Sequence, residues 1–356
     1  MRVLHVTRDL PPRVRGGISV AVGGLVTAAA PHVDQAVVSF DGWRPRAATG
    51  GPPPTEDSLA GVPVLRISAP AHLDAAAAFA RTFAPELVLV HHGMLFDAAC
   101  TFAAAPRALF VHVLQAALSA ERGLTKETLS AAAQRRALAA ADAVFVPSFA
   151  AALPDAQVLP LGVAHRERPA VPRDADLVVC VGRFDVAKGT ADLLAAVPAV
   201  LAARPATRFV LAGGLPDSPK SARRWIRRWT ESATDAERAA VSFPGWLEPS
   251  AVAELQARAA VVVAPSHLET FGLAVLEAQQ MGAAVVASDI AAHRELIADG
   301  VTGRLVPRDG LANGILELLG DVALQRRLGS AAIEAAREAT WERRIGAHVR
   351  AWRALV

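Results

Sequence analysis

Several features are scarce in this chain of 356 residues, and each absence excludes a class of protein. The chain has two cysteines, Cys100 and Cys180, which are too few for a disulfide framework, and neither has a neighbour at zinc-ligand spacing. No apolar run reaches the roughly 18 residues that span a bilayer. The N-terminal segment 1–12 is typical of a strand and its loop, and it lacks the long apolar region and cleavage site of a signal peptide. We therefore expect a cytoplasmic protein.

The chain also has a small net charge and few lysines. The net charge is +3, so no overall field that would gather nucleic acid is expected. Only three of the 37 basic residues are lysines, at Lys126, Lys188 and Lys220. Arginine in place of lysine and abundant alanine are what a G+C-rich genome imposes, so the bias itself indicates no function. It does draw attention to where each lysine lies.

The length and the pattern of apolar residues predict two α/β domains. Hydrophobic residues make up 53% of the chain and charged residues 20%, which is typical of globular proteins. Short β-branched runs alternate with alanine-rich helical segments, as in doubly wound parallel sheets covered on both faces. The expected strands lie at residues 2–7, 35–40, 63–68, 86–92, 107–113 and 143–148, and then at 177–182, 208–214, 240–245, 260–266, 283–288 and 302–307.

A proline- and charge-rich stretch without apolar periodicity separates the two sets of strands. It covers residues 164–176 and is predicted to be an interdomain linker. Domains over 1–163 and 177–340 would each bind ligand at the carboxyl ends of their strands. If these ends faced each other, the two Rossmann-like domains would form one deep cleft.

The strongest functional pattern follows the expected strand at 260–266. Here Glu269 lies in a polar loop, a helix is expected to start near Gly272, and Glu277 comes eight residues after Glu269. The backbone N–H groups of Phe271, Gly272 and Leu273 would be available to a phosphate at that helix start. Two carboxylates on either side of a phosphate suit the hydroxyls of a hexose and a ribose. The alternative is that Glu269 caps the helix and Glu277 is a solvated charge.

The whole pattern PSHLETFGLAVLEAQQMGAAVVASD (265–289), followed by HRELIADGVTGRLVP, resembles the family 4 retaining glycosyltransferases, which include the glycogen-synthase-like group 1 transferases. The resemblance implies the GT-B fold, with two Rossmann-like domains facing a deep cleft. It implies that Glu269 holds the hydroxyls of the donor sugar and Glu277 the ribose of the nucleotide. It also implies a metal-independent reaction without a cofactor, in which a nucleotide-diphosphate sugar is a co-substrate.

A second motif, VGRFDVAKGT (181–190), follows the first strand of the second domain. In the family, the Arg and Lys of such a loop hold the donor diphosphate, which here implies Arg183 and Lys188. Fixed positive charge suits a leaving group that gains negative charge as the glycosidic bond breaks. Taken alone, the motif is also compatible with a surface salt-bridge loop. By resemblance, Gly213 in LAGGLPD (211–217) lies near the nucleoside, and FPGWLEP (243–249) touches the base.

The first half of the chain carries weaker signals at the ends of its strands. By resemblance, Gly16 and Gly17 approach the donor phosphate or the acceptor, and His112 contacts the transferring sugar. His91 and His92 align with a histidine-rich turn near the acceptor. A histidine at a strand end is otherwise a satisfied structural residue, and the residues after His112 depart from the family pattern.

Three further features are assigned no catalytic role. Asp174 and Asp176 spell the D-x-D of metal-dependent transferases, but they fall in the expected linker and are interpreted as a solvated turn. The basic helix expected over 221–238 could bind an anionic acceptor or a membrane surface, although packed tryptophans with arginines reaching into water explain it better. Residues 1–163 carry 13 basic and 12 acidic residues, which disfavours peripheral membrane contact. The segment 341–356 resembles the family's C-terminal helix, which crosses back onto the first domain.

The sequence therefore predicts a retaining glycosyltransferase that moves a hexose-type sugar to a hydroxyl of a soluble small-molecule or glycan acceptor. Three alternatives remain. A hydrolysing sugar-nucleotide epimerase has the same fold but should lack the paired glutamates. A non-catalytic protein would bind the donor without turnover. A nucleic-acid binder is disfavoured by the small net charge and the absence of an aromatic platform.

Overall fold

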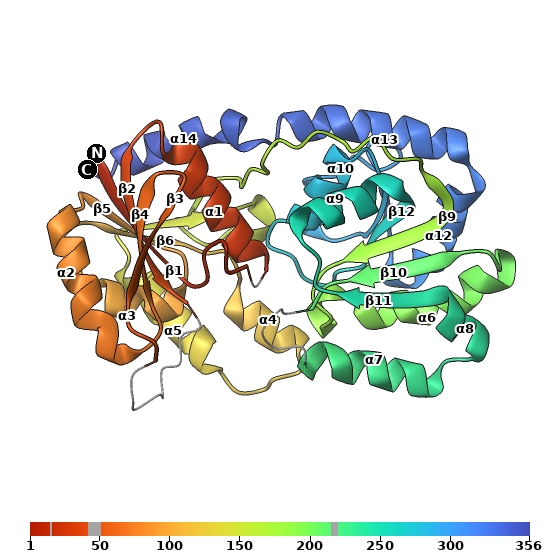
Figure 1. Cartoon of the computed structure of the whole chain (residues 1–356), viewed down its shortest axis with the longest axis horizontal. Helices are drawn as coiled ribbons and strands as arrows, with labels where there is room; N and C mark the ends of the chain where they lie inside the picture. The colour runs from red at the N-terminus through yellow and green to blue at the C-terminus, as the bar shows by residue number, and fades with distance from the viewer. Residues whose placement is uncertain (15, 42–50, 215–219) are drawn as a thin grey trace. The chain divides into compact units, whose positions relative to one another are not determined.

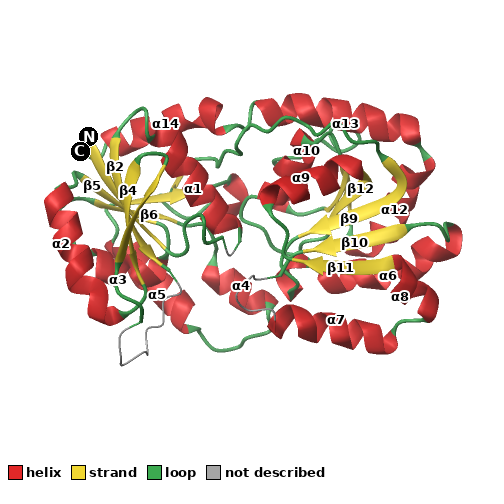
Figure 2. Cartoon of the chain, in the orientation of Figure 1, coloured by secondary structure: helices red, strands yellow, loops and turns green. Residues whose placement is uncertain are grey.

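The computed structural model describes residues 1–14, 16–41, 51–214 and 220–356, with side chains from 220 to 222 excluded, and it divides into two compact units (Figure 1). Unit 1 consists of Met1–Ala164 together with Trp341–Val356, and unit 2 consists of His165–Thr340. Each unit is a sheet with helices on both faces (Figure 2). Among the described residues, no helix is long and apolar enough to cross a membrane.

Unit 1 is built on an eight-stranded sheet with the order β3-β4-β2-β1-β5-β6-β7-β8. All neighbouring strands are parallel except β3 and β4. The central strands are almost entirely buried and apolar, as expected of a parallel sheet covered on both faces. The strands are β1 (Arg2–Thr7), β2 (Asp34–Phe40), β3 (Thr55–Leu59), β4 (Val62–Ile67), β5 (Leu87–Val90), β6 (Arg107–Phe110), β7 (Ala143–Val146) and β8 (Gln157–Val158).

Alanine-rich helices cover one face of this sheet, and α1 and α14 cover the other (Figure 1). Small alanine side chains let α2 and α5 lie close to the strands. The helices are α1 (Gly17–Ala29), α2 (Leu73–Phe83), α3 (Phe96–Ala99), α4 (Gln115–Glu121), α5 (Leu129–Ala140) and α14 (Trp341–Arg353).

The C-terminal helix α14 belongs to unit 1 because its first residue, Trp341, is built into that unit. The Trp341 N–H donates to the carbonyl of Val163 at 3.1 Å. A Cβ at Gly24 of α1 would overlap the Trp341 ring, and a Cβ at Gly162 would overlap its backbone. The two glycines therefore create the space in which the start of α14 packs.

Unit 2 is built on a six-stranded, fully parallel sheet with the order β11-β10-β9-β12-β13-β14. Its strands are β9 (Asp174–Val181), β10 (Arg208–Ala212), β11 (Val241–Gly245), β12 (Ala259–Ala264), β13 (Ala284–Ser288) and β14 (Arg304–Val306). Helices α6 and α12 pack on one face, and α9 and α10 on the other. Its helices are α6 (Thr190–Ala203), α7 (Lys220–Ser232), α8 (Asp235–Ala240), α9 (Pro249–Arg258), α10 (Leu273–Gln280), α11 (Ala291–Arg294), α12 (Leu311–Gly320) and α13 (Val322–Arg337).

The expectation for the D-x-D residues was wrong. Asp174 and Asp176 lie in β9 rather than in a solvated turn of a linker, so β9 begins three residues before the expected strand. Asp174 accepts from Arg208 at 2.5 Å, and Asp176 accepts from Arg204 at 3.0 Å. The two carboxylates are thus used in ion pairs that join the start of β9 to the neighbouring segment.

Candidate functional site

The candidate site in unit 2 lies at the point where the strand order reverses. From β9, the chain builds β10 and β11 on one side of the sheet, and β12, β13 and β14 on the other. Ligands of open α/β sheets bind at such a point, outside the carboxyl ends of the strands. The loops that follow β9 and β12 meet there, and these loops carry the residues predicted to bind the donor.

A glycine brings the two loops into contact. Gly189 has a φ of +64°, and a Cβ there would overlap the carbonyl group of Pro265 in the loop after β12. The His267 N–H donates to the carbonyl of Ala187 at 2.8 Å, which ties the loops a second time. His267 also pairs with Asp192 of α6. The structure therefore requires glycine at position 189, since any side chain would separate the loops.

Lys188 and Glu269 meet in this loop pair although 81 residues separate them in the sequence. The Lys188 Nζ donates to Glu269 Oε1, and the two side chains are 26% and 15% exposed. Ser266 Oγ donates to the same carboxylate oxygen at 3.2 Å. Burial raises the pKa of Glu269, but the charge and hydrogen bond of Lys188 outweigh it, so the pKa stays below its ordinary value. The described structure thus holds this pair as a half-buried ion pair.

The second predicted cation of the loop is engaged in a looser contact. Arg183 lies 3.3 Å from Asp185, Nη2 to Oδ2, and its side chain is 40% exposed. Asp185 also accepts from the Lys188 backbone N–H at 3.0 Å, which caps the short 3-10 turn Val186–Lys188. Asp185 therefore helps to set the positions of both cations.

Helix α10 begins at Leu273, one residue after the predicted start. Gly272 is the residue before the helix and has a φ of +101°, a conformation that favours glycine. Phe271 is buried and anchors the loop, and α10 points its N-terminal end toward the loop that carries Glu269. The first N–H groups of a helix have no intrahelical acceptor and favour an anion.

Glu277 lies in the second turn of α10 and is half-buried. Burial raises its pKa, while the more distant charge of Arg166 opposes this shift. Within the described residues, the Glu277 carboxyl makes no hydrogen bond or ion pair. Among the described residues, the two glutamates therefore have different surroundings. Glu269 contacts a cation, Lys188, whereas Glu277 contacts none.

The two glycine-rich turns after β10 and β11 lie beside each other. The Gly213 N–H donates to the Gly245 carbonyl at 2.8 Å, and Gly213 has a φ of +147°. A Cβ at Gly213 would overlap the carbonyl of Gly182 at the end of β9. Gly213 is thus required for close packing of three strand ends, and Leu215–Asp217 of the predicted turn lie outside the described residues.

One buried residue beside the site was not identified from the sequence. His293 of α11 is fully buried, and its Nδ1 donates to the Ser288 carbonyl at 2.8 Å. Its Cδ2 lies 3.6 Å from the position a Cβ would take at Gly272, and its charge would interact with Glu269 and Lys188. Burial lowers its pKa, so the ring is neutral at pH 7. The signal was its place in the segment HRELIADG (293–300), which follows the motif that contains Glu269 and Glu277.

In unit 1, the predicted residues also follow the strands at the reversal of strand order, between β1 and β5. Gly16 has a φ of +157° and lies directly before α1, which begins at Gly17. His91 and His92 follow β5, and His112 follows β6 two residues after its end. His91 Nδ1 lies 3.0 Å from His112 Nε2, so the structure brings these two rings together.

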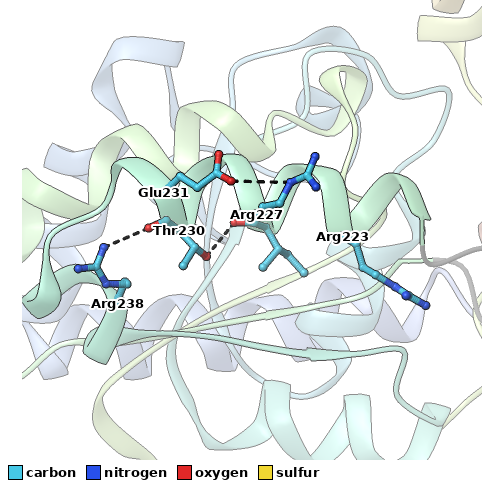
Figure 3. Close-up of a pocket in the computed structure, with 6 residues that line it drawn as sticks. Arg223, Arg227, Thr230, Glu231 and Arg238 are labelled. Carbon is cyan, nitrogen blue, oxygen red and sulfur yellow. Dashed lines mark hydrogen bonds and ion pairs between the residues drawn. The ribbon is translucent and has the colours of Figure 1, made fainter.

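The predicted basic helix is two helices, α7 and α8, separated at Thr234, which forms a capping box with Glu237. Trp225 and Trp229 pack against the core of unit 2, and the Trp229 ring meets Phe243 edge-on at 5.6 Å. The arginines lie along the outer side of the helix, around the shallow pocket drawn in Figure 3. This arrangement agrees with packed tryptophans and solvated arginines.

The charges around that pocket are largely engaged within the α7–α8 pair. Arg227 lies 3.8 Å from Glu231, and Arg238 donates to the carbonyl of Thr230 at 3.1 Å (Figure 3). Such exposed pairs contribute little to stability. Nothing in their geometry converges on a ligand.

Most of unit 2 matches a known protein family. Residues 175–321 match the family described as glycosyl transferases group 1. This part of unit 2 is therefore similar to a group 1 glycosyltransferase domain. It contains the loop pair with Lys188 and Glu269, the start of α10, and Glu277.

Two curated relatives show how far the similarity extends. The chain is 35% identical over 177 residues to phosphatidyl-myo-inositol mannosyltransferase of Mycolicibacterium smegmatis, which covers 48% of this chain and 43% of that protein. It is 28% identical over 375 residues to alpha-maltose-1-phosphate synthase of the same organism, with 94% of each chain covered. The stronger match therefore spans less than half of the relative's length.

Solved structures show the fold of the whole chain. The sucrose-phosphate synthase from Thermosynechococcus elongatus superposes with a TM-score of 0.80, at 22% identity over 99% of this chain and 98% of that one. HepE from Anabaena, solved with UDP and glucose, gives a TM-score of 0.77 at 18% identity over 99% of each chain. The predicted GT-B fold class, with two Rossmann-like units, is confirmed.

Proposed function

We propose that this protein is a retaining glycosyltransferase of family 4 that moves a hexose-type sugar from a nucleotide-diphosphate donor to a hydroxyl of a soluble small-molecule or glycan acceptor in the cytoplasm. The observation that carries the proposal is the contact between Lys188 and Glu269 at the start of α10. It gathers a cation, a carboxylate and the N-terminal end of a helix in the segment that matches the glycosyltransferase family. HepE of the same fold was solved with UDP-glucose.

The cations suit the leaving group. As the bond to the sugar breaks, the nucleoside diphosphate gains negative charge, and fixed positive charge in a half-buried site stabilises that change. Lys188 would act as a point charge and Arg183 as a planar fork. The N-terminal end of α10 would add its amides at Phe271, Gly272 and Leu273. Metal ions have no assigned place in this scheme, and both D-x-D carboxylates are paired with arginines.

The ion pair implies an exchange on donor binding. A diphosphate that draws Lys188 toward itself would release the Glu269 carboxylate, which could then accept hydrogen bonds from hydroxyls of the donor sugar. Glu277 would accept from the ribose, and Gly213 would leave room for the nucleoside. Binding of the phosphate and release of the Glu269 carboxylate would thus be coupled through the contact between Lys188 and Glu269.

For retention, we propose that the acceptor attacks from the same face as the departing phosphate, which takes the proton of the acceptor hydroxyl. Among the residues assigned from the sequence, the strand ends of unit 1 offer histidines rather than a carboxylate nucleophile. Gly16 and Gly17 remain proposed to approach the donor phosphate or the acceptor, and His112 remains proposed to contact the transferring sugar.

A panel of nucleotide sugars, including UDP-glucose and GDP-mannose, tests this function. Slow hydrolysis or transfer should occur with one of them, and NMR should show that the released sugar first appears as the same anomer as in the donor. Release of the opposite anomer would contradict retention. A product epimerised at the sugar would favour the epimerase, and binding by calorimetry without turnover would favour a non-catalytic role.

A further inference from the structure

A row of polar side chains crosses the buried sheet of unit 1 and ends at His112. Its members are Gln35 on β2, His5 on β1, His91 after β5 and His112 after β6, which are four neighbouring segments of the sheet (Figure 1). All four side chains are at most 5% exposed. The row thus runs through an apolar interior, where each polar atom needs a partner.

The strand register explains how the row forms. Gln35 pairs with Val3, His5 pairs with Leu89, and Leu89 pairs with Ala108. Each member therefore lies one strand over and two residues nearer the carboxyl edge than the member before it. Residues two apart share a face of the sheet, so the row climbs diagonally along one face and ends at the edge where ligands bind.

The contacts along the row are hydrogen bonds. His5 Nε2 lies 2.9 Å from Gln35 Oε1, His5 Nδ1 lies 3.1 Å from His91 Nε2, and His91 Nδ1 lies 3.0 Å from His112 Nε2. The origin of the row is the Val26 carbonyl of α1, which accepts from Gln35 Nε2 at 2.9 Å. Every histidine between the ends uses both of its ring nitrogens.

The origin sets the direction of every bond. The Gln35 amide nitrogen must face the Val26 carbonyl, because the opposite orientation would place two acceptor oxygens together. Gln35 then offers an oxygen to His5, so His5 Nε2 carries the hydrogen and His5 Nδ1 accepts. A neutral imidazole has one donor and one acceptor, so His91 and then His112 must repeat the arrangement. Burial lowers the pKa of His5 to about 4 and that of His112 to about 3, and it places the pKa of His91 well below its ordinary value, so the rings are neutral at pH 7.

We propose that Gln35, His5 and His91 are positioning residues that hold His112 in the tautomer with hydrogen on Nε2, so that His112 Nδ1 recognises a hydroxyl of the substrate. A lone pair at Nδ1 accepts from a hydroxyl but is repelled by the oxygen of a phosphate or a carboxylate. The tautomer follows from the row alone, whereas the sugar hydroxyl as the ligand rests on the proposed glycosyltransferase function.

Removing the Gln35 amide should reverse the direction of the hydrogen bonds in the row. In Gln35→Leu, His5 Nε2 loses its acceptor, and a hydrogen left there would be buried without a partner. If His5, His91 and His112 all move their hydrogens to Nδ1, both bonds between the rings are kept and the unpaired hydrogen leaves His5 for the far end of the row. A change on β2 would then convert His112 Nδ1 from an acceptor into a donor, three hydrogen bonds away.

The test is ¹⁵N NMR of protein labelled at its ten histidines, in which long-range ¹H–¹⁵N correlations identify the protonated nitrogen of each ring. In the wild type at pH 7.5, His5, His91 and His112 should all carry hydrogen on Nε2. Gln35→Leu should move all three to Nδ1. Val38→Ala, a truncation on the same strand whose side chain packs on the opposite face of the sheet, is the matched control and should change none of them. A wild-type His112 with hydrogen on Nδ1, or on both nitrogens, would overturn the proposal even if Gln35→Leu failed to fold.

Measurements of turnover test the role of His112 in catalysis separately from the tautomers of the row. With the best donor of the panel, Gln35→Leu should lower kcat about tenfold, as expected for one lost hydrogen bond, while Val38→Ala keeps it. If the tautomers reverse but kcat does not change, the assignment of a substrate hydroxyl to His112 is wrong. If the wild type turns over no donor, the proposed function fails, and the NMR result still decides the tautomer of His112.

Discussion

Acid should unfold unit 1 because it buries several neutral histidines. His5, His91, His112 and His348 are each at most 5% exposed. Burial lowers the pKa of His5 and of His348 to about 4 and that of His112 to about 3, and it lowers that of His91 as well. In the unfolded chain these groups return to about 6.5. Between about pH 6.5 and 4, the unfolded chain therefore binds protons that the folded unit does not.

The sign and the size follow from linkage. The free energy of unfolding rises with pH wherever the unfolded state binds more protons, so stability is full above about pH 6.5 and falls as the pH is lowered. Each such histidine removes about 2 kcal/mol between pH 7 and pH 5, and the four together remove about 8 kcal/mol. That loss is comparable to the whole stability of a typical domain, so unit 1 should unfold near pH 5.

The assay must resolve unit 1 from unit 2, since two units need not unfold together. Pulsed hydrogen exchange at increasing urea, with peptides of Met1–Ala164 read by mass spectrometry, gives the unfolding free energy of unit 1 at each pH. The matched variant is His348→Gln, because His348 Nε2 faces the Pro160 carbonyl at 3.0 Å and a glutamine amide can donate there instead. It should reduce the slope near pH 5.5 by about 1.3 kcal/mol per pH unit, the effect of one proton. A wild-type stability that stays flat from pH 7 to 5.5, or a variant with an unchanged slope, would refute the reasoning.

Three further predictions concern the donor site. Lys188→Ala should lower donor turnover roughly 10²–10³-fold, while exposed Lys126→Ala should not, and an unchanged rate at saturating donor would remove Lys188 from the site. Activity should survive excess EDTA, and loss of activity with rescue by Mn²⁺ would contradict metal independence. Calorimetry with the free nucleoside diphosphate should show that Glu269→Gln keeps binding while Glu277→Gln weakens it by about 1.5–3 kcal/mol, and the reverse order would exchange their roles.

The sequence predicted the buried parts of the fold well, because buried parallel strands are continuous apolar runs. Each of the twelve expected runs overlaps a strand of the structure. The strands that were not predicted, β3 and β8, lie at the edges of the unit 1 sheet. β3 reads TEDSL and is largely exposed, so it carries no apolar signal, and its pairing with β4 alone makes it a strand. β8 has two residues, too few for any periodicity.

The candidate site was predictable as a set of residue types but not as a set of contacts. The motif spacing singled out Lys188 and Glu269, yet nothing in the sequence showed that they pair, because that contact depends on the two loops meeting across Gly189. The row that ends at His112 shows the same limit. His5 is one polar residue in the apolar strand RVLHVT, and its meaning comes only from the register that places it between Gln35 and His91.

Two ion pairs involve the cations predicted to hold the diphosphate, Arg183 and Lys188. Asp185 lies against Arg183 and Glu269 against Lys188, so both cations of the proposed clamp are paired with carboxylates. A half-buried cation without a partner would be costly, and the carboxylates remove that cost while fixing where the cations lie. Under the proposed function, a diphosphate would replace a carboxylate rather than meet an unpaired cation. For Asp185 the exchange has no further effect, since its other oxygen caps the turn before Gly189. For Glu269 it frees the group proposed to hold the sugar, so the leaving group prepares the site of the sugar it carries.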